Sequence, residues 1–130
     1  MNIVILGTGY VGLVTGLGFA KLGNRVACVD IDANKIAKLE MGQASFYDKG
    51  LPELLKEMQE QGKILFTTEL GSVISNADII MIAVGTPPGE YGQADLSFVM
   101  SAADQIGNLL DHEAIIVMKS TVPVGTNRKV

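Results

Sequence analysis

Short runs of apolar residues alternate along the chain with segments whose apolar residues recur at helical spacing. The first run, residues 3–6, is followed by apolar residues at positions 14, 17, 19, 20 and 22, which predicts a strand and then a helix starting near Tyr10. The same alternation predicts strands at residues 25–30, 63–67, 78–84 and 114–119, and helices after Asp32, at 51–61, at 69–75 and after Asp95. The run at 79–84 is continuously apolar, as is typical of a parallel strand covered on both faces.

This order of elements predicts an α/β fold with a Rossmann-type doubly wound parallel sheet and helices on both faces. Right-handed crossovers give the strand order 3-2-1-4-5, which reverses between the first and fourth strands. Those two strands end at Gly7 and Gly85. Ligands of such sheets lie outside the carboxyl ends of the strands at the reversal, so we expect Thr86 to line a ligand crevice. Thr121, just past the fifth strand, is expected to point into the same crevice.

Three glycines, Gly7, Gly9 and Gly12, stand between the first strand and the first helix in the pattern G-x-G-x-x-G. Gly7 permits a sharp turn, Gly9 lets the backbone approach a pyrophosphate, and Gly12 lets the helix sit close to the strand. The N–H groups and the positive dipole end of the helix then face the phosphates. The competing interpretation is a glycine-rich strand–helix connection that binds no ligand. The next acidic residue along the chain helps to distinguish it from a dinucleotide-binding turn.

That acidic residue is Asp30, which lies 18 positions after Gly12 at the end of the second predicted strand. A carboxylate at this place accepts hydrogen bonds from the adenosine ribose hydroxyls and repels a 2'-phosphate, which favours NAD over NADP. The competing interpretation is a solvated aspartate at a strand end. Asp32 is suited to cap the following helix, and Lys35 in its first turn is either an adenosine contact or a surface lysine.

The composition is that of one globular domain spanning residues 1–130, with 48% hydrophobic and 18% charged residues. A net charge of −4 without a Lys/Arg cluster argues against a nucleic-acid partner. The chain starts with a core strand, has no basic leader and has no apolar run long enough to cross a bilayer, so we expect no membrane association and a cytoplasmic location.

Few residues are available for nucleophilic or metal chemistry. Cys28 is the single cysteine and lies within an apolar run, which predicts a buried thiol and excludes an internal disulfide. His112 is the single histidine and lies in a polar stretch that predicts a surface loop. A zinc site or a Ser-His-Asp triad therefore lacks its parts, and we expect no metal.

Four blocks of sequence, together spanning the chain, resemble the UDP-glucose/GDP-mannose dehydrogenase family. They are Gly7–Val14, Cys28–Asp32 with Lys35–Ile36, Ala83–Pro87 with Ala94–Val99, and Lys119–Thr126, and the last two are the more specific. The resemblance implies that two NAD-dependent hydride transfers convert a sugar C6 hydroxyl, through an aldehyde, to a carboxylate. It implies cofactor contacts at Gly7, Thr8, Gly9, Tyr10, Val11, Gly12, Asp30, Lys35, Gly85, Thr86, Pro87, Ser120 and Thr121.

The resemblance also implies a role for Thr121 in orienting a hydrolytic water, and a catalytic cysteine, lysine and aspartate in a later domain. The family commonly has Tyr-Glu-Pro-Gly-Leu where this chain has Tyr47-Asp48-Lys49-Gly50-Leu51, so a stiff turn is replaced by a flexible one. Residues 125–128 look like the opening of an unfinished helix, and we therefore expect the first domain of a longer, homo-oligomeric enzyme that uses a UDP-sugar. Oxidation of UDP-N-acetylmannosamine or GDP-mannose, and a non-catalytic NAD-sensing module, remain alternatives.

Overall fold

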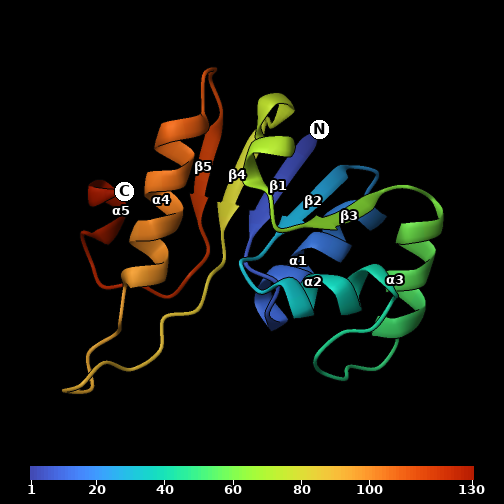
Figure 1. Cartoon of the computed structure of the whole chain (residues 1–130), viewed down its shortest axis with the longest axis horizontal. Helices are drawn as coiled ribbons and strands as arrows, with labels where there is room; N and C mark the ends of the chain where they lie inside the picture. Colours follow the sequence, from blue (N-terminus) through green and yellow to red (C-terminus); the bar gives the residue numbers. More distant parts are fainter.

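The computed structural model describes residues 1–130, and its centre is a five-stranded parallel sheet, drawn as arrows in Figure 1. The strands are β1 (Asn2–Leu6), β2 (Arg25–Val29), β3 (Ile64–Thr67), β4 (Ile79–Ile82) and β5 (Ile115–Met118). Their order is β3-β2-β1-β4-β5, which confirms the predicted order and the Rossmann-type fold. The carboxyl ends of all five strands therefore lie along one edge of the sheet.

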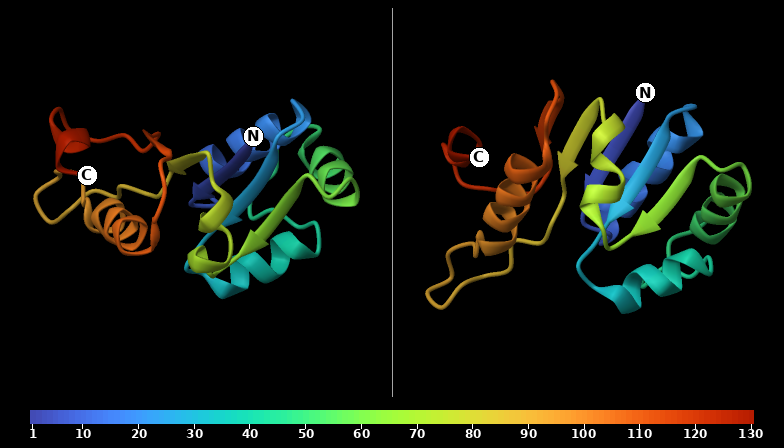
Figure 2. Two further views of the ribbon diagram at one scale, coloured as in Figure 1. Left: turned by 90° about the horizontal axis from the view of Figure 1, so that it is seen from above. Right: turned by 45° about the horizontal axis from the view of Figure 1, so that its top comes forward.

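Successive side chains of β1 point to opposite faces of the sheet and enter two separate cores. Ile3 and Ile5 join a cluster with the buried residues of α1 (Tyr10–Lys21), α2 (Ala33–Glu40) and α3 (Leu51–Glu60). Val4 and Leu6 join a second cluster with α4 (Ser97–Leu109) and two 3-10 turns, η1 (Leu70–Ser72) and η2 (Ile74–Asn76). In Figure 2 (left), α1 (blue) and α4 (orange) lie on opposite sides of the sheet. Because both faces of β1 are covered, its whole apolar run is buried.

Two predictions about helices are wrong, one about the type of helix and one about an N-cap residue. Residues 69–75 form η1 and the start of η2 rather than one α-helix, since Gly71, Val73 and Ile74 are weak helix formers within this short segment. Asp95 is not the N-cap of α4, because that position belongs to Leu96. Asp95 instead accepts a hydrogen bond from the amide of Ser97 (2.9 Å), an Asx-type turn that sets the start of the helix one residue later.

Helix α1 packs closely against β1 and β2, because Gly16 faces the sheet. A Cβ atom on Gly16 would lie 3.0 Å from the Sγ atom of Cys28. Cys28 is completely buried, as predicted, and this burial raises the pKa of its thiol to about 12. The thiol therefore stays protonated at neutral pH and packs as a small apolar group.

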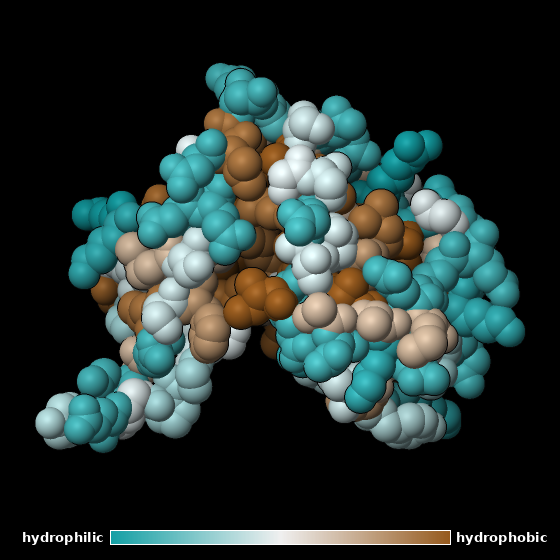
Figure 3. Space-filling model, in the orientation of Figure 1, coloured by the Kyte–Doolittle hydropathy of each residue, from teal (hydrophilic) through white to brown (hydrophobic).

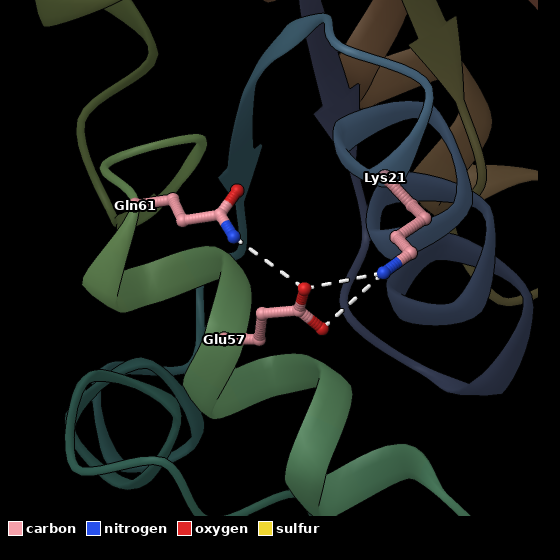
Figure 4. Close-up of polar contacts among 3 residues, drawn as sticks. All are labelled: Lys21, Glu57 and Gln61. Carbon is pink, nitrogen blue, oxygen red and sulfur yellow. Dashed lines mark hydrogen bonds and ion pairs between the residues drawn. The ribbon is translucent and has the colours of Figure 1, made fainter.

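The carboxyl end of α1 is joined to α3 by a small polar cluster (Figure 4). The ammonium of Lys21 lies 3.1 Å from Oε1 of Glu57, which also accepts a weak hydrogen bond from Gln61 (3.4 Å). Because the Lys21 and Glu57 side chains are 57% and 43% exposed, water and salt screen the pair, and it contributes at most about 1 kcal/mol. Apolar packing holds these helices together.

Strand β5 forms as predicted but lies at an edge of the sheet and is only partly covered. Ile115 is 63% exposed and Ile116 is 37% exposed, whereas the paired residues of β4 are half-buried or buried. The core cluster of the α1–α3 layer contains residues of β1 to β4, whereas β5 contributes only the partly buried Val117 to its edge. None of the helices combines the length and apolar character that crossing a bilayer requires.

His112 joins the loop before β5 to the loop before β4. Its Nε2 atom lies 2.8 Å from the carbonyl oxygen of Ala77, and its Nδ1 atom lies 3.2 Å from Oδ1 of Asp111. The Ala77 carbonyl, then the Asp111 hydrogen bond, and the nearby charges of Asp111 and Asp78 raise the pKa of His112 against a smaller opposing desolvation. His112 lies in an exposed loop, as predicted, and its contacts with Ala77 and Asp111 give it a structural role.

We predict that His112 makes the stability of the chain pH-dependent. Since the folded pKa is raised above the unfolded value of about 6.5, the contribution is complete below that pH and is lost as the pH rises through the folded pKa. The difference in unfolding free energy between the parent and His112→Gln, measured by urea denaturation, should shrink as the pH rises above the unfolded value of about 6.5. A difference that stays constant or grows over this range contradicts the assignment.

Candidate functional site

The turn between β1 and α1 has no room for side chains at two of its three glycines. Gly7 has a φ of +110°, and a Cβ atom there would lie 2.3 Å from the carbonyl oxygen of Ala83 at the end of β4. A Cβ atom on Gly12 would lie 2.0 Å from the carbonyl oxygen of Gly7. Both distances are far below van der Waals contact, so the fold itself requires these glycines. They bring the start of α1 directly against the ends of β1 and β4.

Gly9 differs from its two neighbours because its missing side chain leaves empty space. Apart from Gly9 and its two chain neighbours, no residue has an atom within 4 Å of the Cβ position, and the φ of −70° is one that any residue adopts. Gly9 is also the N-cap of α1, which has no side-chain cap and no acidic residue in its first turn. The first N–H groups and the positive end of the helix dipole are thus free for an anionic ligand, which is the arrangement that a pyrophosphate requires.

Asp30 follows β2 immediately, and both of its carboxylate oxygens are already fixed. Oδ2 accepts hydrogen bonds from the hydroxyl of Thr8 (2.6 Å) and the amide of Thr8 (3.0 Å), and Oδ1 accepts one from the amide of Asp32 (3.0 Å). Partial burial raises the pKa of Asp30, but these hydrogen bonds and the charge of Lys35 outweigh it and hold the pKa below its ordinary value. The carboxylate is therefore ionised at neutral pH.

Helix α2 begins beside this carboxylate. Its N-cap is Asp32, as predicted, whose Oδ1 atom accepts hydrogen bonds from the amides of Asn34 (3.0 Å) and Lys35 (3.2 Å). The cap places Lys35 in the first turn, with its side chain at the same cavity as Asp30. The carboxylate of Asp30 and the ammonium of Lys35, at this end of the cleft, thus both come from the short segment between β2 and the first turn of α2.

The segments that follow β4 and β5 form the opposite wall. The hydroxyl of Ser120 donates a hydrogen bond to the carbonyl oxygen of Val84 (2.8 Å), so it joins the ends of the two strands. Thr121 is exposed and lines the same cavity as Thr86 and Gly85. Pro87 accepts a hydrogen bond from the amide of Asp95 (2.7 Å) and closes the base of a loop that projects from the molecule (Figure 1, lower left).

These segments enclose one open cavity of about 620 Å³ at the carboxyl edge of the sheet. Figure 3 shows the surface hollowed at the lower centre, between the lobe that carries α4 and the lobe that carries α2 and α3. Eleven of the predicted site residues line the cavity: Gly7, Thr8, Gly9, Tyr10, Val11, Asp30, Lys35, Gly85, Thr86, Ser120 and Thr121. Gly12 and Pro87 do not line it; Gly12 lies beneath the turn and Pro87 lies at the base of the projecting loop.

Sequence reasoning missed the part of the cavity wall that α4 supplies. Phe98, Ser101 and Gln105 line the cavity, together with Thr68 after β3. The signal available was topological, since the helix that follows the fourth strand begins at the same edge of the sheet. The outer wall thus combines an aromatic ring with hydroxyl and amide groups.

The loop in which this chain departs from the family pattern contacts the first residue of α1. The hydroxyl of Tyr10 donates a hydrogen bond to Oδ2 of Asp48 (3.2 Å), and the ring of Tyr10 lies 5.2 Å from that of Phe46. The Asp48 hydrogen bond, and then its charge, raise the pKa of Tyr10. The loop therefore supports the glycine turn from outside, although it lacks the proline.

A parallel sheet of this order, with a glycine turn, an uncapped helix N-terminus and an acidic residue after β2 at one cleft, defines a dinucleotide-binding Rossmann domain. The family model described as "UDP-glucose/GDP-mannose dehydrogenase family, NAD binding domain" matches residues 1–130. The chain belongs to this family, whose NAD-binding domain it represents, and its relatives are oxidoreductases.

Individual relatives agree with this assignment. A UDP-glucose 6-dehydrogenase of Bacillus subtilis is 48% identical over 99% of the chain. The structure of a UDP-glucose dehydrogenase from Pyrobaculum islandicum matches with a TM-score of 0.91 and 38% identity over 96% of the chain. That of a GDP-mannose dehydrogenase from Pseudomonas aeruginosa matches with a TM-score of 0.95 and 31% identity over 100% of the chain. The chain spans 28%, 30% and 30% of the lengths of these three proteins.

Proposed function

We propose that the full-length protein is a UDP-glucose 6-dehydrogenase, which oxidises the C6 hydroxyl of UDP-glucose to the carboxylate of UDP-glucuronate with two NAD. The observation that carries this proposal is the 48% identity to the UDP-glucose 6-dehydrogenase of Bacillus subtilis over 99% of the chain. The chain described here would supply the NAD-binding half of the site. NAD, when bound, provides the hydride acceptor for the oxidation.

The proposed cofactor position follows the cleft from the glycine turn to the end of β2. The turn from Gly7 to Gly12, with the first N–H groups of α1, would hold the pyrophosphate, since Gly9 leaves open space there. The Asp30 carboxylate would accept hydrogen bonds from the adenosine ribose, because it is ionised and held at the cavity wall. Lys35 would lie along the adenosine half from the first turn of α2.

The nicotinamide end would lie at the wall formed after β4 and β5. Thr86 and Thr121 border the cavity there, and their hydroxyls are suited to contact the nicotinamide ribose. In the family resemblance Thr121 also orients a water, a role that its exposure at the cavity permits. Ser120 would act through the backbone, since its hydroxyl is engaged by the carbonyl of Val84.

The residues that we propose to contact the cofactor do not include a cysteine. Cys28 is completely buried and its thiol stays protonated, because burial raises its pKa to about 12. The resemblance assigns the nucleophile to a cysteine of a later domain. We therefore expect the chain alone to bind NAD without oxidising a nucleotide sugar.

A second candidate is a GDP-mannose dehydrogenase. The specific observation that favours it is the structural match to the Pseudomonas aeruginosa enzyme, whose TM-score of 0.95 exceeds the 0.91 of the Pyrobaculum islandicum enzyme. Sequence identity favours UDP-glucose instead, at 38% against 31% for the same two structures. Sequence identity is the better guide to the substrate, because backbone similarity reflects the shared fold more than the substrate.

The substrate assignment is tested with the full-length protein and three substrates: UDP-glucose, UDP-N-acetylmannosamine and GDP-mannose. We expect NADH formation, followed by absorbance, to be fastest with UDP-glucose and to reach two NADH for each sugar consumed. Faster turnover of either other sugar nucleotide assigns the enzyme to that substrate. Tight NAD binding without turnover of any of the three supports an NAD-sensing module.

Replacement of Gly9 by valine should abolish NAD binding and leave the fold intact. The new side chain meets no protein atom within 4 Å of its Cβ and would occupy the space of the pyrophosphate. We expect the Kd for NAD to rise at least about 100-fold in titration calorimetry, with a melting temperature close to that of the parent. Gly18→Val is the matched control, since Gly18 also has open space, in α1 and away from the cavity. Parent-like affinity in the Gly9 variant contradicts the phosphate position.

The cofactor preference should move toward NADP when the negative charge at the ribose position is replaced by a positive one. Asp30→Ser combined with Ile31→Arg does this, because Ile31 is 74% exposed at the cavity. We expect the ratio of NADP to NAD affinity to rise by about 100-fold, through loss of like-charge repulsion and gain of an arginine–phosphate contact. The single variant Ile31→Arg, which retains Asp30, controls for the arginine alone. An unchanged ratio in the double variant contradicts the ribose role.

A further inference from the structure

Thr8 lies within the glycine turn, yet its side chain faces the protein rather than the ligand space. The residue is 2% exposed and is one of only two buried polar residues in the chain. Its hydroxyl donates to Oδ2 of Asp30 at 2.6 Å, and its amide donates to the same oxygen at 3.0 Å. One residue of the turn between β1 and α1 thus makes two hydrogen bonds to the carboxylate that follows β2.

These bonds determine what the Asp30 carboxylate can do. A carboxylate has about four acceptor sites. The Thr8 hydroxyl, the Thr8 amide and the Asp32 amide occupy three of them, two on Oδ2 and one on Oδ1. Oδ1 is therefore the oxygen with remaining capacity for a ligand hydroxyl. The two donors on Oδ2 set the rotation of the carboxylate and hence the direction in which Oδ1 points.

We infer that the hydroxyl of Thr8 is a specificity-determining positioning group, which holds Asp30 in the orientation that selects a free ribose diol over a phosphorylated one. This inference rests on the proposed ribose role of Asp30. Thr8 does not touch the ribose; it acts through the carboxylate. The same bond ties the phosphate-binding turn to the ribose-binding group, so that both subsites form one unit.

The alternative is that the Thr8 hydroxyl only stabilises the turn. The two roles differ in their consequences, because a structural hydroxyl changes the melting temperature without changing the ratio of NAD to NADP affinity. A positioning hydroxyl changes that ratio and also the pKa of Asp30, since one of the donors that stabilise the ionised carboxylate is lost.

Thr8→Ser and Thr8→Ala form the matched pair for the test, because they differ only by the hydroxyl oxygen. We expect Thr8→Ser to keep the parent ratio of NAD to NADP affinity within about three-fold, and Thr8→Ala to reduce this ratio by about ten-fold, measured by titration calorimetry on the chain. Carboxyl-carbon NMR titration should show a higher Asp30 pKa in Thr8→Ala than in Thr8→Ser. Thr8→Val, which retains the volume of threonine, should behave like Thr8→Ala.

Equal cofactor ratios and equal Asp30 pKa values in the serine and alanine variants would overturn the inference, whatever their melting temperatures. Asp30→Asn distinguishes this failure from failure of the ribose role. If Asp30→Asn reduces the preference for NAD while Thr8→Ala does not, only the role of Thr8 is wrong. If Asp30→Asn also leaves the preference unchanged, the ribose role itself is wrong and the inference about Thr8 falls with it.

Discussion

The geometry of the site depends on a steric constraint at the start of α1. Because Gly12 has no Cβ atom, the backbone of α1 can approach the carbonyl oxygen of Gly7 closely. Because Gly7 has no Cβ atom, the turn can approach the carbonyl oxygen of Ala83, at the end of β4, in the same way. Any larger residue at either place would push the helix away from the sheet. Because the contact joins α1 to both β1 and β4, it fixes the direction of the helix N-terminus at the point where the strand order reverses.

A rigid frame stands behind this contact. The central strand β1 is buried on both faces by two independent apolar cores, and it pairs along its length with β2 and β4. The ends of these three strands therefore have fixed positions relative to one another, and so do the residues that directly follow them. Asp30 depends on it in particular, because its carboxylate reaches from the end of β2 to the turn after β1.

The sequence allowed the fold and eleven of the 23 residues that line the cavity to be predicted, for a reason that lies in parallel sheets. Apolar runs mark the strands, and the rule that ligands lie at the carboxyl ends places Gly7, Asp30, Gly85 and Thr121 at one edge without any knowledge of side-chain contacts. The positions of Cys28 and His112 likewise followed from the polarity of their neighbours, and the structure confirms both.

What could not be predicted depends on side-chain direction. The spacing of Val99, Ala102 and Ile106 gives the buried face of α4, but not that Phe98 and Gln105 beside it border the cavity. That Thr8 faces inward follows from the backbone of the turn and has no signature in the one-letter sequence. Pro87 was predicted at the cavity from its place in a motif, whereas the hydrogen bond to Asp95 holds it at the base of the projecting loop.

The uncapped N-terminus of α1 implies a conflict between the stability of the empty protein and its function. An aspartate or serine at the N-cap position of Gly9 would satisfy one of the free N–H groups and stabilise the helix by roughly 1 kcal/mol. The same side chain would occupy the place where an anion is expected, and an aspartate would repel it. Engineering this domain for heat resistance without ligand would therefore tend to remove the feature on which cofactor binding depends.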